Sequence, residues 1–350
     1  MSLEKGSGIA TYGRHLLRTL EAGGVQTSIL VGPNGRIGVD ALVDSVALFD
    51  SVRSSRKMSK LRRRIYTWQA AFGLQARWRD RSAQIVPPDD QAHSMPLRGA
   101  WMCRDVFHTA GRRFEGHRQL TALHFKPEEG EQVPHLVHWT SGLPLIAKNA
   151  VNIHTIHDII PIRLPNTTLD YKDKYIALAR TIAERSDHLI VVSEDTRRDV
   201  VEILGVDESR VTNLYQSVEP LHPDRSDAEI ARLLADTFSL GWKEYFLHYG
   251  AVEPKKNLGR LVEAYLRSGA RRPLVIVGAK GWLDAPEIAL LSAAQRSGGE
   301  AASRIRRYDY LPAPVLADLV RGARATLFPS LYEGFGLPVL ESMMSGTAVL

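Results

Sequence analysis

The 350 residues of this chain are enough for two domains, and a content of 44% hydrophobic and 24% charged residues is typical of a globular protein. The net charge is +6, and the single cysteine, Cys103, excludes an internal disulfide and fits a reducing compartment. No apolar run is long enough to span a bilayer and no apolar signal region is present, so we expect a cytoplasmic protein, at most peripheral on the inner face of the cell membrane.

The first helix is predicted where apolar residues recur at helical spacing from Ile9 to Leu20, and Gly23 and Gly24 end it. A strand is expected over residues 25–31. The next hundred residues carry weaker patterns, which predict helices around 62–75 and 101–107.

A basic stretch runs from Arg53 to Arg81. It holds ten basic residues and one acidic residue, Asp80, with Trp68, Phe72 and Trp78 interleaved. Such a surface suits an anionic membrane, and it also suits nucleic acid. The alternative is a solvated helix face whose aromatic residues pack into the core. We expect the membrane surface or the core packing, and no nucleic-acid partner.

Strands and helices alternate regularly from residue 135. Strands are predicted over 135–139, 151–156, 188–192 and 210–215, and helices over 169–185 and 194–204. Ser193 is a good N-cap for the second helix, and Gly205 is expected to end it.

Residues 217–239 are expected to cross into a second domain. In that domain strands are predicted over 245–249, 274–277, 304–310, 325–328 and 347–350. Helices are predicted over 258–266, which Asn257 would cap, and over 287–294, 314–323 and 338–344. Alternation of short apolar strands with helices predicts doubly wound parallel sheets. We therefore predict an α/β protein with two Rossmann-like domains, residues 1–218 and 219–350.

Both domains are expected to be incomplete. Five residues before Gly6 are too few for the strand that should open a doubly wound domain, and the chain stops at Leu350 as a strand begins. Exposed sheet edges are expected as a result.

Two carboxylates near the C-terminus, Glu333 and Glu341, stand eight positions apart with a glycine-rich turn and Pro338 between them. The proline suits the first turn of a helix, whose amides and dipole favour an anion. The amides expected to point at it are those of Phe335, Gly336, Leu337 and Val339. Glu341 would lie one turn into the helix, within reach of a ribose diol. This pattern predicts a nucleotide-sugar site, and the alternative is a turn with two solvated glutamates.

This stretch resembles the E-x7-E signature of retaining glycosyltransferases of family 4, which have the two-domain GT-B fold. The resemblance implies that Glu333 contacts the donor sugar, that Glu341 holds the nucleotide ribose, and that the turn Phe335–Leu337 holds the diphosphate. It also implies two domains that face a cleft, the first on the acceptor side and the second binding the nucleotide sugar.

Three further positions match the family. Gly8 belongs to a Gly-Ser-Gly segment before the first helix, which resembles the family's N-terminal glycine loop. His157 follows a predicted strand at the end where such folds bind ligands, and the resemblance places it near the sugar and the leaving diphosphate, as a hydrogen-bond donor. Lys256 matches the phosphate-binding lysine, while Ala251 stands where the family usually has arginine. The structural alternatives are that Gly8 is a glycine of the kind common before helices, that His157 only hydrogen-bonds to neighbouring backbone, and that Lys256 is an ordinary solvated lysine.

The resemblance implies glycosyl transfer with catalytic roles for His157, Glu333 and Lys256. Charge on the leaving diphosphate would be stabilised by Lys256, His157 and the turn amides. Front-face attack is favoured, because no carboxylate is obviously placed as a nucleophile. No cofactor and no metal ion are expected.

The donor and acceptor are suggested by the segment Glu253–Asn257, which is similar to mannosyltransferases of polysaccharide assembly. GDP-mannose is therefore the favoured donor, with GDP-fucose, dTDP-rhamnose and UDP-sugars left open. The acceptor is expected to be a saccharide or lipid-linked saccharide. The alternatives are another GT-B enzyme (an epimerase or a sugar synthase), an inactive fragment of such an enzyme, or a nucleic-acid-binding module.

Overall fold

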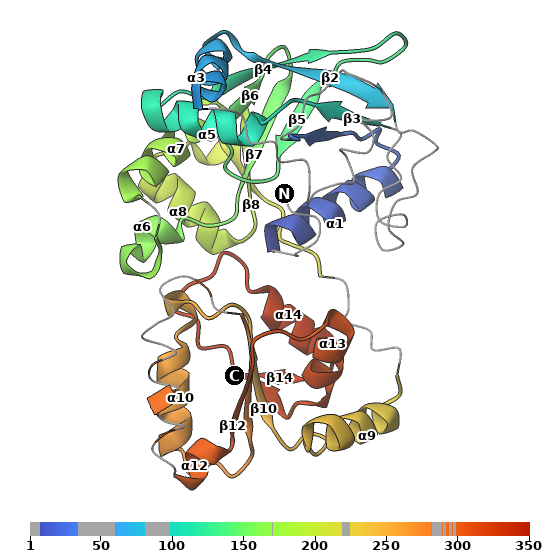
Figure 1. Ribbon diagram of the computed structural model, residues 1–350, viewed down its shortest axis with the longest axis vertical. Coiled ribbons are helices and arrows are strands. Elements are labelled where there is room, and N and C mark those ends of the chain that lie inside the picture. The colour runs from blue at the N-terminus through green and yellow to red at the C-terminus, as the bar shows by residue number, and fades with distance from the viewer. Residues whose placement is uncertain are drawn as a thin grey trace. The chain divides into compact units, whose positions relative to one another are not determined.

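The computed structural model describes residues 8–33, 60–80, 99–169, 171–218, 225–279, 281, 289, 292–293, 296 and 299–350 (Figure 1). The chain divides into two compact units, the first made of Met1–Asp158 and Asp173–Tyr215 and the second of Ile159–Lys172 and Gln216–Leu350. Gly6, the basic residues of 53–59, Arg81 and most of the helix expected over 287–294 lie outside the described residues.

The first sheet of unit 1 is mixed. Its strands are β1 (Ile29–Val31), β2 (Leu74–Asp80), β3 (Gly99–Met102), β4 (Thr121–Lys126) and β6 (Leu145–Ala147), in the order β1-β3-β2-β4-β6. β2 and β3 are antiparallel and the other pairs are parallel. The prediction of parallel sheets throughout is therefore wrong for this one pair.

The helix predicted over 101–107 is replaced by β3. All four residues of Gly99–Met102 are buried, and the strand lies between β1 and β2. So short an apolar run shows no period that separates a strand from a helix. The helix α5 (Val106–His117) starts only after it.

The helix predicted around 62–75 ends earlier than expected. α3 spans Lys60–Gln69 and is followed by the 3-10 turn η1 (Ala70–Phe72). Gly73, with a φ of 96°, then turns the chain into β2, where alternate residues are buried. Trp78 of β2 packs edge to face on Trp101, with ring centroids 5.3 Å apart, at the centre of the unit's core.

The second sheet of unit 1 is parallel throughout and confirms the predicted alternation. Its strands are β5 (Leu136–Trp139), β7 (Val151–Ile156), β8 (His188–Val191) and β9 (Val211–Asn213), in that order. α1 (Gly8–Ala22), α7 (Lys172–Arg185) and α8 (Glu194–Leu204) belong to the same unit. Ser193 caps α8, because its Oγ accepts from the Thr196 amide at 3.1 Å, and Gly205 ends the helix with a φ of 70°.

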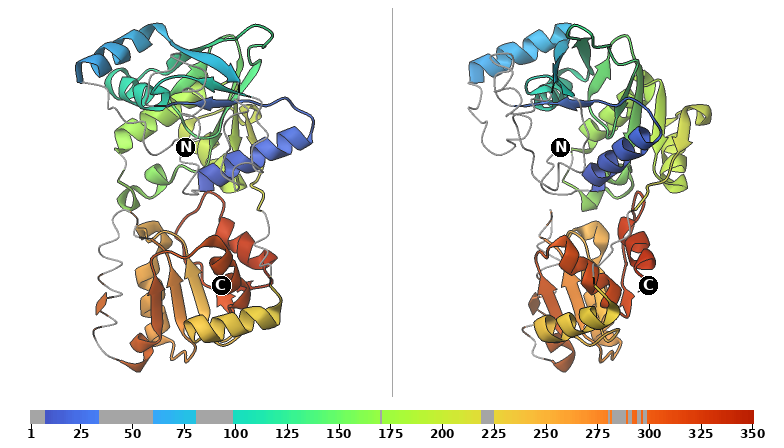
Figure 2. Two further views of the ribbon diagram at one scale, coloured as in Figure 1. Left: turned by 45° about the vertical axis from the view of Figure 1, so that its right-hand side comes forward. Right: turned by 90° about the vertical axis from the view of Figure 1, so that its right-hand side faces the viewer.

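Unit 2 holds one parallel sheet with helices on both faces (Figures 1 and 2). The strands are β10 (Phe246–Tyr249), β11 (Leu274–Val277), β12 (Ile305–Tyr308), β13 (Ala325–Thr326) and β14 (Ala348–Val349), in the order β12-β11-β10-β13-β14. α10 (Leu258–Arg267) and α12 (Glu300–Ser303) lie on one face. α9 (Asp227–Phe238), α13 (Ala313–Gly322) and α14 (Leu337–Met344) lie on the other.

Alternate residues of β11 face opposite sides of the sheet and belong to two separate parts of the unit 2 core. Leu274 and Ile276 pack with α10, whereas Val275 and Val277 pack with α9 and α13. Because β11 is covered on both faces, all four of its residues are apolar and buried. Such a continuous apolar run is typical of strands in parallel sheets.

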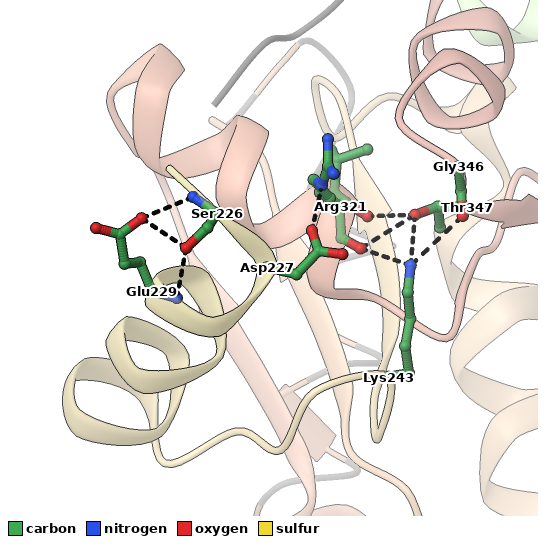
Figure 3. A network of polar contacts seen from close by, with 8 residues as sticks. Ser226, Asp227, Glu229, Lys243, Arg321, Gly346 and Thr347 are labelled. Atoms are coloured by element: carbon green, nitrogen blue, oxygen red, sulfur yellow. Dashed lines mark hydrogen bonds and ion pairs between the residues drawn. The ribbon is translucent and has the colours of Figure 1, made fainter. Parts of the chain in front are cut away.

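A polar clamp joins the segments that lead into β10 and β14 (Figure 3). Lys243 Nζ donates to the carbonyl of Arg321 at 2.5 Å and to Thr347 Oγ1 at 3.1 Å. Arg321 Nε in turn pairs with Asp227 Oδ1 at 2.7 Å. The clamp therefore ties the amino ends of two strands to the end of α13 and the start of α9.

No helix in the described part of the chain combines the length and the apolar character needed to cross a bilayer.

Candidate functional site

Lys256 and Glu333 meet at the carboxyl end of the unit 2 sheet. Lys256 closes the 3-10 turn η4 (Pro254–Lys256) after β10, and Glu333 follows β13, the parallel neighbour of β10. Lys256 Nζ lies 2.5 Å from Glu333 Oε1, and the two side chains are 13% and 18% exposed. The ammonium also lies 5.4 Å from the centroid of the Phe328 ring. Two of the predicted catalytic residues are thus in direct contact.

Backbone and amide bonds hold the loops that carry this pair. The Leu331 amide donates to the Lys255 carbonyl at 2.8 Å, and Asn257 Nδ2 donates to the Pro329 carbonyl at 3.2 Å. Asn257 is left-handed, with a φ of 57°, and makes no side-chain cap bond to α10. The expected cap is therefore wrong, because this side chain joins two loops instead.

Lys255, which precedes Lys256 in η4, lies near another carboxylate. Its Nζ is 3.9 Å from Glu253 Oε2, and both side chains are largely buried. The ammonium of Lys255 is therefore paired with the Glu253 carboxylate.

The glycine-rich turn leads into α14 as predicted. Gly336, with a φ of 93°, precedes the first helical residue, Leu337, and Pro338 follows in the first turn. The Val339 amide donates to the Gly336 carbonyl at 3.0 Å, so the expectation that this amide points at an anion is wrong. The amides of Gly336 and Leu337 make no hydrogen bond to the described part of the chain. Phe335 is half-buried in the turn.

Glu341 lies one turn into α14 and accepts a hydrogen bond from the end of β10. Tyr249 Oη lies 3.1 Å from Glu341 Oε2 and 2.8 Å from the Pro338 carbonyl. Burial raises the pKa of Glu341, and the bond from Tyr249 acts against that rise. A half-buried carboxylate that accepts hydrogen bonds is suited to a pair of hydroxyl groups.

His248, the neighbour of Tyr249 on β10, points to the other face of the sheet. Nδ1 lies 3.0 Å from the Leu327 carbonyl, and Nε2 is buried without a hydrogen-bond partner among the described residues. Burial lowers the pKa of His248, and the nearby Lys256 charge adds to that effect. His248 therefore lies within electrostatic range of both Lys256 and Glu333.

In unit 1, His157 directly follows β7. Its Nε2 lies 2.9 Å from the Thr140 carbonyl, which can only accept, so this nitrogen carries a proton. Burial lowers the pKa of His157. A hydrogen bond from Nε2 to a diphosphate would have to replace the one to Thr140.

The start of α1 lies beside the same strand end. The Tyr12 ring is edge-on to His157, with centroids 5.0 Å apart, and Tyr12 Oη lies 3.0 Å from Thr155 Oγ1. Gly8, the exposed first residue of α1, is four positions earlier and so shares a helix face with Tyr12. The structure therefore brings the predicted glycine and the predicted histidine to one region.

His154, on the same strand, has a structural role. It is fully buried, Nδ1 lies 2.8 Å from Ser186 Oγ, and the ring stacks on Trp139. Burial lowers the pKa of His154 to about 4.

Tyr12, Tyr249 and His248 were missed by reasoning from the sequence. The one sequence feature that could have indicated them is a polar aromatic residue within an otherwise apolar helix face or strand. The same feature is common in ordinary protein cores, so it does not identify a site. Among the described residues, no group of three His, Cys, Asp or Glu side chains is arranged as around a metal ion.

Two family models match the chain. The one described as Glycosyltransferase Family 4 matches residues 120–220, and the one described as Glycosyl transferases group 1 matches residues 235–350. The second match contains Lys256, Glu333 and Glu341.

Two relatives illustrate the similarity. O-antigen chain mannosyltransferase B from Escherichia coli is 30% identical over 205 residues, which cover 57% of this chain and 52% of that protein. The serotype-specific mannosyltransferase WbdA, also from Escherichia coli, is 29% identical over 202 residues, which cover 55% of this chain and 24% of that protein. The matched region therefore spans about half of the first relative and about a quarter of the second.

Solved structures show the same fold. Sucrose-phosphate synthase from Thermosynechococcus elongatus has a TM-score of 0.56 at 15% identity, covering 98% of this chain and 75% of that chain. HepE from Anabaena, solved in complex with UDP and glucose, has a TM-score of 0.51 at 13% identity, covering 69% and 62%. The predicted GT-B fold is confirmed.

Proposed function

We propose that this chain, which belongs to the family 4 glycosyltransferases and has their GT-B fold, transfers a hexose from a nucleotide sugar to a saccharide or lipid-linked saccharide. The observation that carries the proposal is the meeting of Lys256, Glu333 and the start of α14 at the carboxyl end of one parallel sheet. This is where open α/β sheets bind ligands.

Unit 2 takes the nucleotide sugar in this proposal, and the domain boundary falls near residue 218. Lys256 and the amides of Gly336 and Leu337 hold the diphosphate, Glu341 holds the ribose, and Glu333 contacts the sugar. The positive end of α14 adds to the attraction for an anion. The positive charge is then supplied by the chain itself, and the reaction needs no metal ion.

Unit 1 binds the acceptor in this proposal, and Gly8 and His157 are the residues of unit 1 that take part in the site. The acceptor hydroxyl attacks the anomeric carbon as the bond to the diphosphate breaks, and its proton passes to the departing phosphate oxygen. Lys256 and the turn amides stabilise the negative charge that develops on that oxygen. Attack on the same face retains the anomeric configuration, and a covalent sugar–Glu333 adduct would contradict it.

The donor is GDP-mannose in this proposal. The support is the segment Glu253–Asn257 and the names of the relatives, which are mannosyltransferases. Relatives named for the O-antigen chain point to an acceptor in cell-surface polysaccharide synthesis.

Calorimetric titration of GDP, UDP and dTDP without metal tests the donor site. One diphosphate should bind the wild type and fail to bind Glu341→Ala, while Glu300→Ala, at an exposed glutamate of α12, should bind normally. Product analysis with and without an acceptor then separates transfer from epimerisation, because an epimerase needs the donor alone. If no diphosphate binds, the proposed function is wrong for this chain.

The exposed face of α3 and η1 suits the surface of an anionic membrane, and the protein would act there as a peripheral protein on the cytoplasmic side. Trp68 and Phe72 are 67% and 77% exposed, and their rings lie edge to face at 5.6 Å. Ile65 and Arg64 are exposed one turn earlier. Large aromatics beside basic side chains favour the interface of anionic lipids. Trp78, in contrast, is buried in the core.

Co-flotation with vesicles that contain phosphatidylserine tests this surface. The double substitution Trp68→Ser and Phe72→Ser should abolish binding, and added salt should weaken it. Tyr310→Ser is a matched control, because Tyr310 is equally exposed on unit 2. Equal flotation of both variants would argue against the α3 surface.

A further inference from the structure

Tyr249 links the sheet of unit 2 to the helix that carries Glu341. It is the last residue of β10 and is 5% exposed. Its hydroxyl oxygen lies 2.8 Å from the Pro338 carbonyl, 3.1 Å from Glu341 Oε2 and 3.2 Å from Ser342 Oγ. One hydroxyl thus contacts the backbone and two side chains of α14.

The distribution of protons in this cluster makes Tyr249 a donor to Glu341. The Pro338 carbonyl and an ionised carboxylate can only accept, so the single phenolic proton is shared between them. Ser342 Oγ donates to Thr326 Oγ1 at 2.8 Å, on the neighbouring strand β13. This proton is therefore directed from α14 to the sheet, and the side chain that donates to Glu341 is that of Tyr249.

The same bond affects the charge of Glu341. Burial favours the neutral acid and raises its pKa, whereas a hydrogen bond from Tyr249 favours the carboxylate. A carboxylate accepts two hydroxyl hydrogen bonds, while the neutral acid has lost part of that capacity.

We propose that Tyr249 is a positioning residue, whose hydroxyl holds the Glu341 carboxylate and the first turn of α14 in the arrangement that receives the ribose diol of the donor nucleotide. This inference rests on the proposed function. It adds a specific requirement, because the helix start that holds the diphosphate and the carboxylate that holds the ribose are fixed by one buried hydroxyl group.

Tyr249→Phe removes the hydroxyl and keeps the ring. Tyr265→Phe is the matched control, because Tyr265 is also buried in unit 2 and its hydroxyl donates to a backbone carbonyl, that of Arg272, at 2.8 Å. GDP is the probe, measured by calorimetry on the full chain. Tyr249→Phe should weaken GDP binding about tenfold, the usual effect of losing a hydrogen bond to a charged group, and Tyr265→Phe should change it less than about twofold.

A double-mutant cycle separates positioning from a general loss of structure. If Tyr249 acts through Glu341, Tyr249→Phe should weaken GDP binding less in the Glu341→Gln protein than in the wild type, because only the bond to the Pro338 carbonyl is then left to lose. Additive losses, or wild-type affinity in Tyr249→Phe, would overturn the proposal.

Titration of the Glu341 carboxyl by NMR gives a readout that does not depend on the donor. Tyr249→Phe should move the Glu341 midpoint to higher pH, and Tyr265→Phe should leave it in place. If wild type binds no GDP but the midpoint moves, the assigned donor is wrong while the Tyr249–Glu341 link stands. An unchanged midpoint would refute the link itself.

Discussion

Lys256 Nζ and Glu333 Oε1 lie 2.5 Å apart although the residues are separated by 77 positions in the chain. The pair is largely buried, so water screens it less than it screens a surface salt bridge. The cation expected to hold the diphosphate is therefore already bound to the carboxylate expected to contact the sugar. A phosphate that reaches Lys256 must compete with Glu333 for the same ammonium.

Separating this pair should affect binding and transfer differently. Glu333→Gln removes the competing charge, so we expect GDP binding that is equal or several-fold tighter, with transfer reduced about a hundredfold or more. Lys256→Met should weaken GDP binding at least about tenfold, because the charge attracting the phosphate is lost. Calorimetry and a radiolabelled transfer assay measure the two effects. Weaker GDP binding in Glu333→Gln would show that Glu333 does not compete with the phosphate.

Substitution of Gly336 should impair both stability and donor binding. Its φ of 93° is costly for any residue with a Cβ, so Gly336→Ala should lose about 1–2 kcal/mol of unfolding free energy and displace the start of α14. Gly269→Ala is the control, because its φ of 68° carries a similar penalty in the turn after α10. Urea unfolding should show comparable losses for both, and calorimetry should show weaker GDP binding for Gly336→Ala alone. Equal GDP affinity of the two variants would contradict a role for the turn in binding.

The clamp at Lys243 should contribute to stability without contributing to binding. Lys243→Met removes donors from the Arg321 carbonyl and Thr347 Oγ1, so we expect a loss of about 1–2 kcal/mol in unfolding free energy. GDP affinity should persist, since the clamp lies at the amino ends of the strands and the proposed site at their carboxyl ends. An exposed lysine of β4, Lys126, provides the control substitution to methionine. Loss of GDP binding in a folded Lys243→Met protein would show that the two ends are coupled.

Buried histidine should make unit 1 sensitive to acid. The pKa of His154 is lowered from 6.5 to about 4 by burial, so between these values the unfolded chain binds a proton that the folded chain does not. Stability should therefore fall as the pH drops from about 6.5 to 4, by roughly 3 kcal/mol for this residue. Urea unfolding as a function of pH measures the slope, which should be smaller in His154→Gln. His108→Gln, at a side chain that is 74% exposed, should keep the wild-type slope. A slope unaffected by His154→Gln would assign the acid sensitivity to other groups.

Patterns within a few neighbouring residues account for most of what could be predicted. The alternation in unit 2, the cap at Ser193, the end of α8 at Gly205 and the strand–turn–helix around Gly336 depend on side-chain period and backbone geometry. The two glutamates at fixed spacing were found for the same reason, because the turn and the helix start between them are formed by neighbouring residues.

Contacts between distant segments decided the rest. Gly99–Met102 forms a strand because it pairs with β1 on one side and β2 on the other. Trp78 is buried in the core, whereas Trp68 is exposed. The sequence by itself predicted the five strands of the unit 2 sheet and the helices α10, α13 and α14. Only the tertiary structure joined Lys256 to Glu333 and Tyr249 to Glu341, since hydrogen bonds across 77 and 92 positions exist only after strands have paired in a particular order.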